Sequence, residues 1–259
     1  MSVEVAFKVM PHAQTELHAV HRLFDYRQSL ATKPYASRGM KVSRCRRCLL
    51  PEKVCTCAWR KPCQSQAAFA LVMYDAEVLK PSNSGRLIAD LIPDTHAFLW
   101  SRTQPDQQLI ALLSDDRYQP YLVFPGEYAQ QQRVINDFTD EVPLLHRNHK
   151  TPLFVLLDGC WREAVKMFRK SPYLQHLPML SFQSDMLANY RLRKGKRDFQ
   201  LGTAEVASLV LQAFGETANA EALAAWFDLF VECTLWSRSQ NKWASLERID
   251  ELRQRVAQR

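Results

Sequence analysis

A strand followed directly by a helix is predicted from residues 156–170, which read LLDGCWREAVKMFRK. An apolar run extends from Leu153 to Leu157, and Asp158 follows it at once. Unbroken apolar runs of this length are typical of strands that are buried on both faces of a parallel sheet. We therefore predict a strand over 152–158 whose carboxyl end carries a carboxylate.

The residues after Asp158 are predicted to form an amphipathic helix. Trp161, Ala164, Val165 and Phe168 recur at helical spacing and form its apolar face. The first turn of such a helix offers free backbone N–H groups to an anion, at the sheet edge where ligands of open α/β folds bind. From the pattern alone, Asp158 either caps this helix or takes part in chemistry, and both interpretations stay open.

Further short apolar runs predict the rest of an α/β fold with a mostly parallel sheet and helices on both faces. The remaining strands are predicted over 67–73, 96–100, 121–124 and 178–182. Helices are predicted over 18–30, after the turn at 81–85, over 107–113, 129–138, 203–214 and 219–237, and in the charged tail. We divide the chain into an N-terminal segment with a cysteine module (1–66) and a larger α/β domain (67–259).

Composition excludes several classes of protein. With 259 residues, 47% hydrophobic and 24% charged, the chain is neither disordered nor fibrous. No apolar run approaches the roughly 20 residues that span a bilayer, and the N-terminus lacks the apolar core of a secretory signal. We therefore expect a cytoplasmic protein without a membrane partner. Oligomeric state cannot be predicted from these features.

The formal charge of +7 is concentrated in two short stretches. Residues 41–61 contain seven basic residues against one acid, and residues 191–198 contain five against one. Aromatic residues adjoin both, as in grooves that hold single-stranded or looped RNA. The alternative is that both stretches are solvated loops. The candidate RNA-binding residues are Arg44, Arg46, Arg47, Lys53, Arg193, Lys194, Lys196 and Arg197.

Four of the seven cysteines lie within the segment RCRRCLLPEKVCTC. Cys45, Cys48, Cys55 and Cys57 have the spacing C-x2-C-x6-C-x-C, which in a reducing compartment favours metal over disulfides. Four thiolates complete a tetrahedral zinc shell and leave no open position, so the predicted site is structural. The alternatives are unligated thiols or a ligand set in which Cys63 replaces one of the four.

Two other helix entrances have small or polar residues before an apolar periodic run. SNSGRL (82–87) contains Gly85 for close backbone approach and Arg86 for a carboxylate or phosphate. LGTAEV (201–206) offers Thr203 as an N-cap with Glu205 in the first turn. Together with the entrance after Asp158, these two predict a ligand site that is assembled from three loops.

The combination of these motifs resembles the DTW-domain family. The resemblance rests on DGCWREA, KMFRKSPYL, LPMLSF, YRLRK, TAEV, NSGRL and the cysteine segment, and it runs from about Arg44 to Ala213. Two positions depart from the family pattern, because Cys160 replaces a threonine and Gly202 stands where serine is expected. Cysteine is a poor N-cap, so the family's hydroxyl at position 160 is interpreted as structural rather than chemical. Asp158 and Trp161 are then the two residues of this motif that are interpreted as functional.

The resemblance implies a SPOUT-like domain, knotted near its cofactor site, that binds S-adenosylmethionine. The most similar members are bacterial tRNA-uridine aminocarboxypropyltransferases, which move the 3-amino-3-carboxypropyl group of S-adenosylmethionine to N3 of uridine at position 47 of tRNA and release methylthioadenosine. The implied catalytic residues are Asp158, Trp161 and Glu163. The implied cofactor-binding residues are Asn83, Ser84, Gly85, Arg86, Leu157, Gly159, Cys160, Tyr190, Arg191, Thr203 and Glu205.

In this interpretation Asp158 is the candidate base that removes the N3 proton of uridine. Arg86 or Arg191 would hold the carboxylate of the cofactor's amino acid. The rival enzyme is an RNA methyltransferase on the same scaffold, and the rival from another class is a zinc-stabilised RNA-binding protein without chemistry. The three entrance motifs together weigh against the second rival, and the identity of the small product separates the two enzymes.

Overall fold

The structure is a computed structural model that describes residues 16–32, 42–182, 201–237 and 245–258. Its centre is a six-stranded sheet in which every pair is parallel and the strand order is β2-β1-β5-β3-β6-β4. The strands are β1 (Ala68–Met73), β2 (Thr95–Leu99), β3 (Tyr118–Val123), β4 (Val134–Ile135), β5 (Thr151–Asp158) and β6 (Met179–Leu180). This arrangement confirms the predicted α/β fold with a parallel sheet.

β5 lies near the middle of the sheet, between β1 and β3. Alternate side chains of β5 belong to different hydrophobic clusters. Phe154 and Leu156 pack in one cluster, and Leu153 and Val155 pack in the other. Burial on both faces explains the unbroken apolar run of the sequence. The register pairs Asp158 with Met73 of β1, so the carboxylate lies where two neighbouring parallel strands end together.

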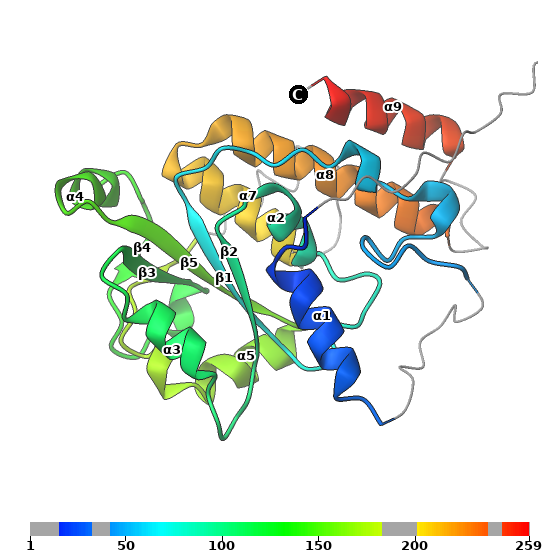
Figure 1. Cartoon of the computed structure of the whole chain (residues 1–259). Coiled ribbons are helices and arrows are strands. Elements are labelled where there is room, and N and C mark those ends of the chain that lie inside the picture. The colour runs from blue at the N-terminus through cyan, green and yellow to red at the C-terminus, as the bar shows by residue number, and fades with distance from the viewer. Residues whose placement is uncertain (1–15, 33–41, 183–200, 238–244, 259) are drawn as a thin grey trace, which may run out of the picture.

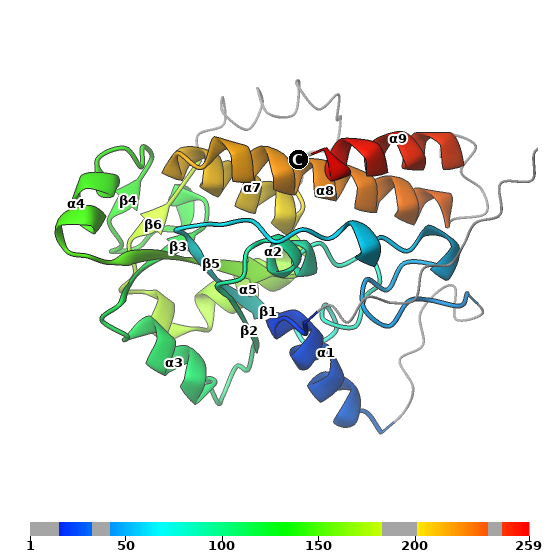
Figure 2. The same ribbon diagram turned by 45° about the horizontal axis from the view of Figure 1, so that its top comes forward.

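Helices cover both faces of the sheet, and Figures 1 and 2 show α7 and α8 above it with α3 and α5 below. The upper layer contains α2 (Arg86–Leu91), α7 (Thr203–Phe214) and α8 (Thr217–Trp236), and the lower layer contains α3 (Gln107–Leu113) and α5 (Trp161–Arg169). The remaining helices are α1 (Ala19–Ser29), α4 (Glu141–Arg147) and α9 (Leu246–Ala257). α2 and α5 therefore follow two adjacent strands, β1 and β5, and pack on opposite faces of the sheet.

The cysteine module packs onto the upper helical layer. It contains two short 3-10 helices, η1 (Glu52–Val54) and η2 (Cys57–Trp59). Cys45, Cys48, Leu50 and Val54 belong to the same hydrophobic cluster as the buried residues of α8 and α9. The guanidinium of Arg253 lies 4.3 Å from the centre of the Trp59 ring. One continuous core therefore joins the module to the rest of the described chain.

Two details of the predicted elements differ from the structure. Residues 129–138 do not form a helix, because Val134 and Ile135 pair as β4 with β6 at the edge of the sheet. α4 was not predicted, although its proline stands in the first turn, where proline is tolerated. The expected knot depends on the path of residues 183–200, which lie outside the described residues, and it stays a prediction. None of the described helices is long and apolar enough to cross a membrane.

Candidate functional site

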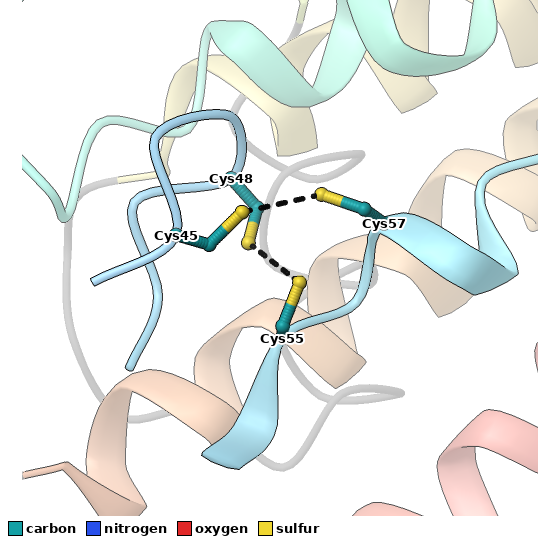
Figure 3. A group of neighbouring side chains, drawn as sticks. All are labelled: Cys45, Cys48, Cys55 and Cys57. Atoms are coloured by element: carbon teal, nitrogen blue, oxygen red, sulfur yellow. Dashed lines mark hydrogen bonds between the residues drawn. The ribbon is translucent and has the colours of Figure 1, made fainter. Parts of the chain in front are cut away.

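The four cysteines of the module point toward one another (Figure 3). Their sulfur atoms all lie within 4.8 Å of one another, with Cys45 Sγ 3.7 Å from Cys57 Sγ and Cys48 Sγ 3.7 Å from Cys55 Sγ. Four sulfurs held about 2.3 Å from one zinc ion in a tetrahedron lie about 3.8 Å apart. The cluster therefore has the dimensions of a zinc-tetrathiolate site and can hold a metal.

Backbone and side-chain donors surround the cluster. The backbone N–H of Arg47 donates to Cys45 Sγ over 3.4 Å. Arg253 of α9 donates from Nη2 to the carbonyl of Cys55 over 3.3 Å. Outer contacts of this kind orient metal ligands. Cys63 is not a member of the four-sulfur cluster.

Asp158 joins the three predicted helix entrances. One carboxylate oxygen accepts a hydrogen bond from Asn83 Nδ2 over 2.6 Å, and the other accepts from the hydroxyl of Thr203. Asn83 precedes α2, Asp158 precedes α5 and Thr203 begins α7. The carboxylate is 2% exposed, and its partners are side chains of the other two entrances rather than the backbone of α5. Its contacts therefore differ from those of a cap of α5.

Close packing holds this junction together. A Cβ at Gly85 would come within 2.5 Å of the carboxylate oxygen of Asp158, so only glycine leaves room for the aspartate. Asn83 also accepts a hydrogen bond from the N–H of Arg86 with its Oδ1, which fixes the orientation of its amide. The three entrances are thus locked around one buried carboxylate.

Burial raises the pKa of Asp158 from its ordinary value of 3.8 to about 6. Desolvation is the dominant cause, and the hydrogen bonds from Thr203 and Asn83 oppose it. A carboxyl group whose pKa lies close to neutrality can both accept and release a proton at physiological pH. Asp158 therefore stays a candidate general base, although it is almost fully buried.

The two glutamates of the entrances serve their own helices. The N–H of Cys160 donates to Glu163 Oε2 over 2.7 Å, and the N–H of Gly202 donates to Glu205 Oε2 over 2.9 Å. In both pairs the glutamate side chain accepts from the backbone N–H of the N-cap residue of its own helix, which is one of the two hydrogen bonds of a capping box. The N-cap of α7 is therefore Gly202 rather than Thr203 as predicted, and this shift by one residue turns the Thr203 hydroxyl toward Asp158.

A cavity of about 940 Å³ opens at the carboxyl ends of β3, β5 and β6. Leu157, Gly159, Cys160 and Trp161 line it from the α5 entrance, and Thr203 lines it from α7. Asp158 and the residues of the α2 entrance are not among its lining residues. Thr203 is thus the link between the cavity and the buried carboxylate.

Trp161 ends a stack of aromatic rings beside the cavity. Its indole lies 5.6 Å from the Phe124 ring at 10°, and Phe124 lies 4.9 Å from Phe168 at 14°. Tyr128 meets Trp161 edge-on at 80°. Phe124 and Phe168 are buried, whereas Trp161 is 40% exposed. Trp161 was predicted on the buried face of α5, but Met167 occupies that face with Ala164 and Phe168 instead.

The model of one known family matches the chain. It is described as the DTW domain, and it covers residues 42–235. The chain belongs to the DTW-domain family. This domain is associated with enzymes that modify tRNA, and the chain is therefore assigned to a tRNA-modifying family. No solved structure matches the chain significantly.

Within this DTW domain, Arg86 follows the Asp158 junction in the α2 entrance and does not line the cavity. Its side chain is buried, and its guanidinium donates to the carbonyl of Lys80 over 3.2 Å and to that of Arg47 over 3.4 Å. Its Nε has no partner among the described residues. These contacts tie the α2 entrance to the cysteine module rather than offering a charge to the cavity. Ser84 lies at the start of α7, where its hydroxyl accepts from the N–H of Ala204 over 3.5 Å.

The predicted RNA-binding residues are only partly described. Arg46 and Lys53 are exposed on the cysteine module, whereas Arg44 is half-buried and donates to the carbonyl of Leu49 over 3.0 Å. Arg47 is half-buried as well. The candidates Tyr190, Arg191, Arg193, Lys194, Lys196 and Arg197 lie outside the described residues, and their roles stay predictions.

Several residues of the site were not singled out from the sequence. Phe124, Gly126 and Ser181 line the cavity, and Ser181 Oγ accepts from the N–H of Gly126 over 2.8 Å. The segment FPGEY directly after β3 carries a turn signal at the end of a buried strand. That is the same signal that marked the other entrances, and it could have placed this loop beside them.

Proposed function

We propose that the chain transfers the 3-amino-3-carboxypropyl group of S-adenosylmethionine to N3 of a uridine in tRNA, at position 47 as its resemblance implies, and leaves methylthioadenosine. The observation that carries the proposal is the junction of Asp158 with Thr203 at the wall of the cavity. This junction places a proton-accepting carboxyl one hydroxyl away from the space where two substrates can meet.

The cavity suits a nucleoside-bearing cofactor. Small-molecule sites commonly enclose about 300–1,000 Å³, with mostly apolar walls and a few polar groups, and the volume here of about 940 Å³ lies in this range. The open end of the Trp161 stack would offer a flat surface to a base. When bound, S-adenosylmethionine supplies a sulfonium whose three attached carbons are all activated for transfer. The walls of the cavity must therefore select the carbon by position.

The proton of uridine N3 must leave as the new N3–C bond forms and the C–S bond breaks. Thr203 Oγ1 can accept this proton while it passes its own proton to Asp158, to which it already donates. Such a relay lets Asp158 act as the base from its buried position. The hydrogen bond from Asn83 holds the carboxylate in place for the transfer.

Cys45, Cys48, Cys55 and Cys57 would hold a structural zinc ion in this proposal. A closed shell of four thiolates supplies no open coordination site, so the ion would fold the module rather than take part in the reaction.

The proposal is tested by the products. The protein is incubated with S-adenosylmethionine and tRNA that lacks the modification, and both the nucleosides and the small product are weighed. Label on the carboxyl carbon of the cofactor should enter a uridine, with methylthioadenosine as the by-product. A methylated nucleoside with S-adenosylhomocysteine would instead identify a methyltransferase, and no incorporation into any nucleoside would leave the chain without the proposed chemistry.

A matched pair of variants tests the relay. Thr203→Val keeps the shape of the side chain and removes the hydroxyl, whereas Thr203→Ser keeps the hydroxyl. We expect Thr203→Val to lower transfer by about 10²–10⁴-fold, the usual contribution of acid–base catalysis, and Thr203→Ser to retain most of it. Equal activity of the two variants would show that the hydroxyl carries no proton.

A further inference from the structure

One face of α5 is lined with basic side chains. Arg162, Lys166, Arg169 and Lys170 are all exposed. Their spacing of three, four and eight residues places them along one side of the helix, over about two turns or roughly 12 Å. None of these residues was among the RNA-binding residues predicted from the sequence.

Two aromatic rings adjoin this basic face. Tyr74 follows β1 and Trp100 follows β2, and their rings are stacked with centres 5.7 Å apart and an angle of 20°. Lys166 Nζ lies 5.4 Å from the centre of the Tyr74 ring and 5.6 Å from that of Trp100. Trp100 is anchored by its Nε1–H, which donates to Ser171 Oγ over 2.9 Å. Both rings are half-buried, so part of each reaches the surface.

Acidic side chains do not neutralise this surface. Among the described residues, no carboxylate forms an ion pair with any of the four basic residues. Glu163 on the same helix accepts from the N–H of Cys160, and Asp75, next to Tyr74, is paired with Arg27 at 2.6 Å. The positive charge of the face therefore remains available to a partner.

The surface begins at the rim of the candidate site. The N–H of Tyr74 donates to the carbonyl of Asp158 over 2.8 Å. α5 itself starts at Trp161, which lines the cavity. A strand that placed one nucleotide in the cavity would therefore pass over the exposed side of α5 with its neighbouring nucleotides.

We propose that Arg162, Lys166, Arg169 and Lys170, with Tyr74 and Trp100, form a binding surface for the RNA strand that flanks the modified nucleotide. This inference rests on the proposed function. The basic residues contact phosphates, and the Tyr74–Trp100 pair offers π-surface to an unpaired base, which is the usual combination for single-stranded RNA. A membrane surface would require an apolar stripe beside the charges. The one large hydrophobic residue exposed on α5 is Trp161, which belongs to the cavity.

The test compares three proteins. The variant Arg162→Gln/Lys166→Gln/Arg169→Gln removes three charges from α5, and Arg147→Gln/Arg248→Gln/Arg255→Gln removes three charges from exposed positions on α4 and α9 as the matched control. Affinity for tRNA is measured by filter binding between 50 and 300 mM salt. Each phosphate contact contributes about 0.7–0.9 to the slope of log K against log salt, so the α5 variant should lose about 2 units of slope and bind at least about tenfold more weakly. The control should match the unaltered protein.

A fourth protein, Tyr74→Leu, tests the aromatic pair. It removes the ring, to whose hydroxyl Lys166 Nζ donates over 3.2 Å, and keeps apolar bulk. It should weaken binding several-fold and change the salt slope by less than one phosphate contact, because stacking involves no counterion release. Binding of S-adenosylmethionine, measured by calorimetry, should be unchanged in the α5 variant and serves as the check of folding.

The outcomes separate this inference from the proposed function. If the unaltered protein binds and modifies tRNA but the α5 variant keeps the same affinity and slope, the surface is not an RNA site and the function stands. If the unaltered protein does not bind tRNA, both ideas fail. Retained tRNA binding combined with α5-dependent binding to phosphatidylserine vesicles would assign the face to a membrane and overturn the inference.

Discussion

Replacing Asp158 by asparagine should change how stability depends on pH. The buried carboxyl has a pKa of about 6 instead of its ordinary 3.8, and this difference of about 2 units corresponds to about 3 kcal/mol. Because the folded chain holds this proton more tightly than the unfolded chain, the resulting stabilisation is complete below about pH 4. It is lost as the pH rises through about 6. At neutral pH the folded chain therefore contains an ionised group that its surroundings disfavour.

The Asp158→Asn variant removes this ionisation but also alters the hydrogen bonds. Asparagine offers one acceptor oxygen to the two donors, Asn83 Nδ2 and the Thr203 hydroxyl, and leaving a buried donor unpaired costs about 1–3 kcal/mol. The lost acceptor and the removed ionisation have similar magnitudes and opposite signs at neutral pH. We therefore expect the variant to be less stable than the unaltered protein at pH 4.5 and close to it at pH 7.5.

Urea unfolding of both proteins from pH 4.5 to pH 8 measures the difference. It should shift by about 2 kcal/mol in favour of Asp158→Asn across this range, because part of the linkage lies below pH 4.5. Asp116→Asn, at an exposed position, serves as the control and should show no such shift. A constant difference across the range would mean that the pKa of Asp158 is not raised. If the variant is as stable as the unaltered protein at pH 7.5 but lacks transfer, the carboxylate acts in the reaction; retained transfer would refute its role as base.

Three further predictions concern other parts of the molecule. The protein should contain about one zinc ion by atomic emission. Changing any one of Cys45, Cys48, Cys55 or Cys57 to serine should release the ion, whereas Cys63→Ser should retain it. Loss of the metal in Cys63→Ser alone would show that the proposed set of four ligands is wrong. Gly85→Ala forces a Cβ against the Asp158 carboxylate, so we expect urea unfolding to show a free energy of unfolding that is lower by about 1–3 kcal/mol. An unchanged free energy of unfolding would show that the residues around Asp158 can move apart. Charge reversal at Arg193, Lys194, Lys196 and Arg197 should weaken tRNA binding and flatten its salt dependence, and equal affinity at low and high salt would identify that stretch as a solvated loop.

The parts of the fold that could be predicted are those in which a single pattern had one physical cause. The apolar runs of β1 and β5 fit burial on both faces of a parallel sheet, so both strands were located within a residue of their observed bounds. β4 has only two residues at the edge of the sheet and owes its existence to pairing with β6. Its local sequence carries too little pattern to separate it from a helix.

The candidate site was predictable in its location and not in its contacts. Parallel strands bring their carboxyl ends to one edge, so three polar helix entrances could be expected to meet there. A shift of one residue in the position of a helix N-cap changes which side chains face the site. Gly202 rather than Thr203 caps α7, and the Thr203 hydroxyl consequently reaches Asp158. Likewise, the sequence could not show that Arg86 points at carbonyl groups and not at the cavity.

The contacts of Arg86 also connect the cysteine module to the Asp158 junction. Its guanidinium donates to the carbonyl of Arg47, which stands between Cys45 and Cys48, and its own N–H donates to the Asn83 side chain that holds Asp158. Burial disfavours this guanidinium and lowers its pKa, and the negative charges of Asp90, Cys48 and Asp158 oppose the shift. A zinc-tetrathiolate site would place further compensating negative charge nearby. A module that served only RNA binding would not need to reach the α2 entrance. Here the cysteine cluster, Arg86, Asn83 and Asp158 form one chain of contacts, and we therefore expect loss of order in the cysteine module to disturb the position of the candidate base.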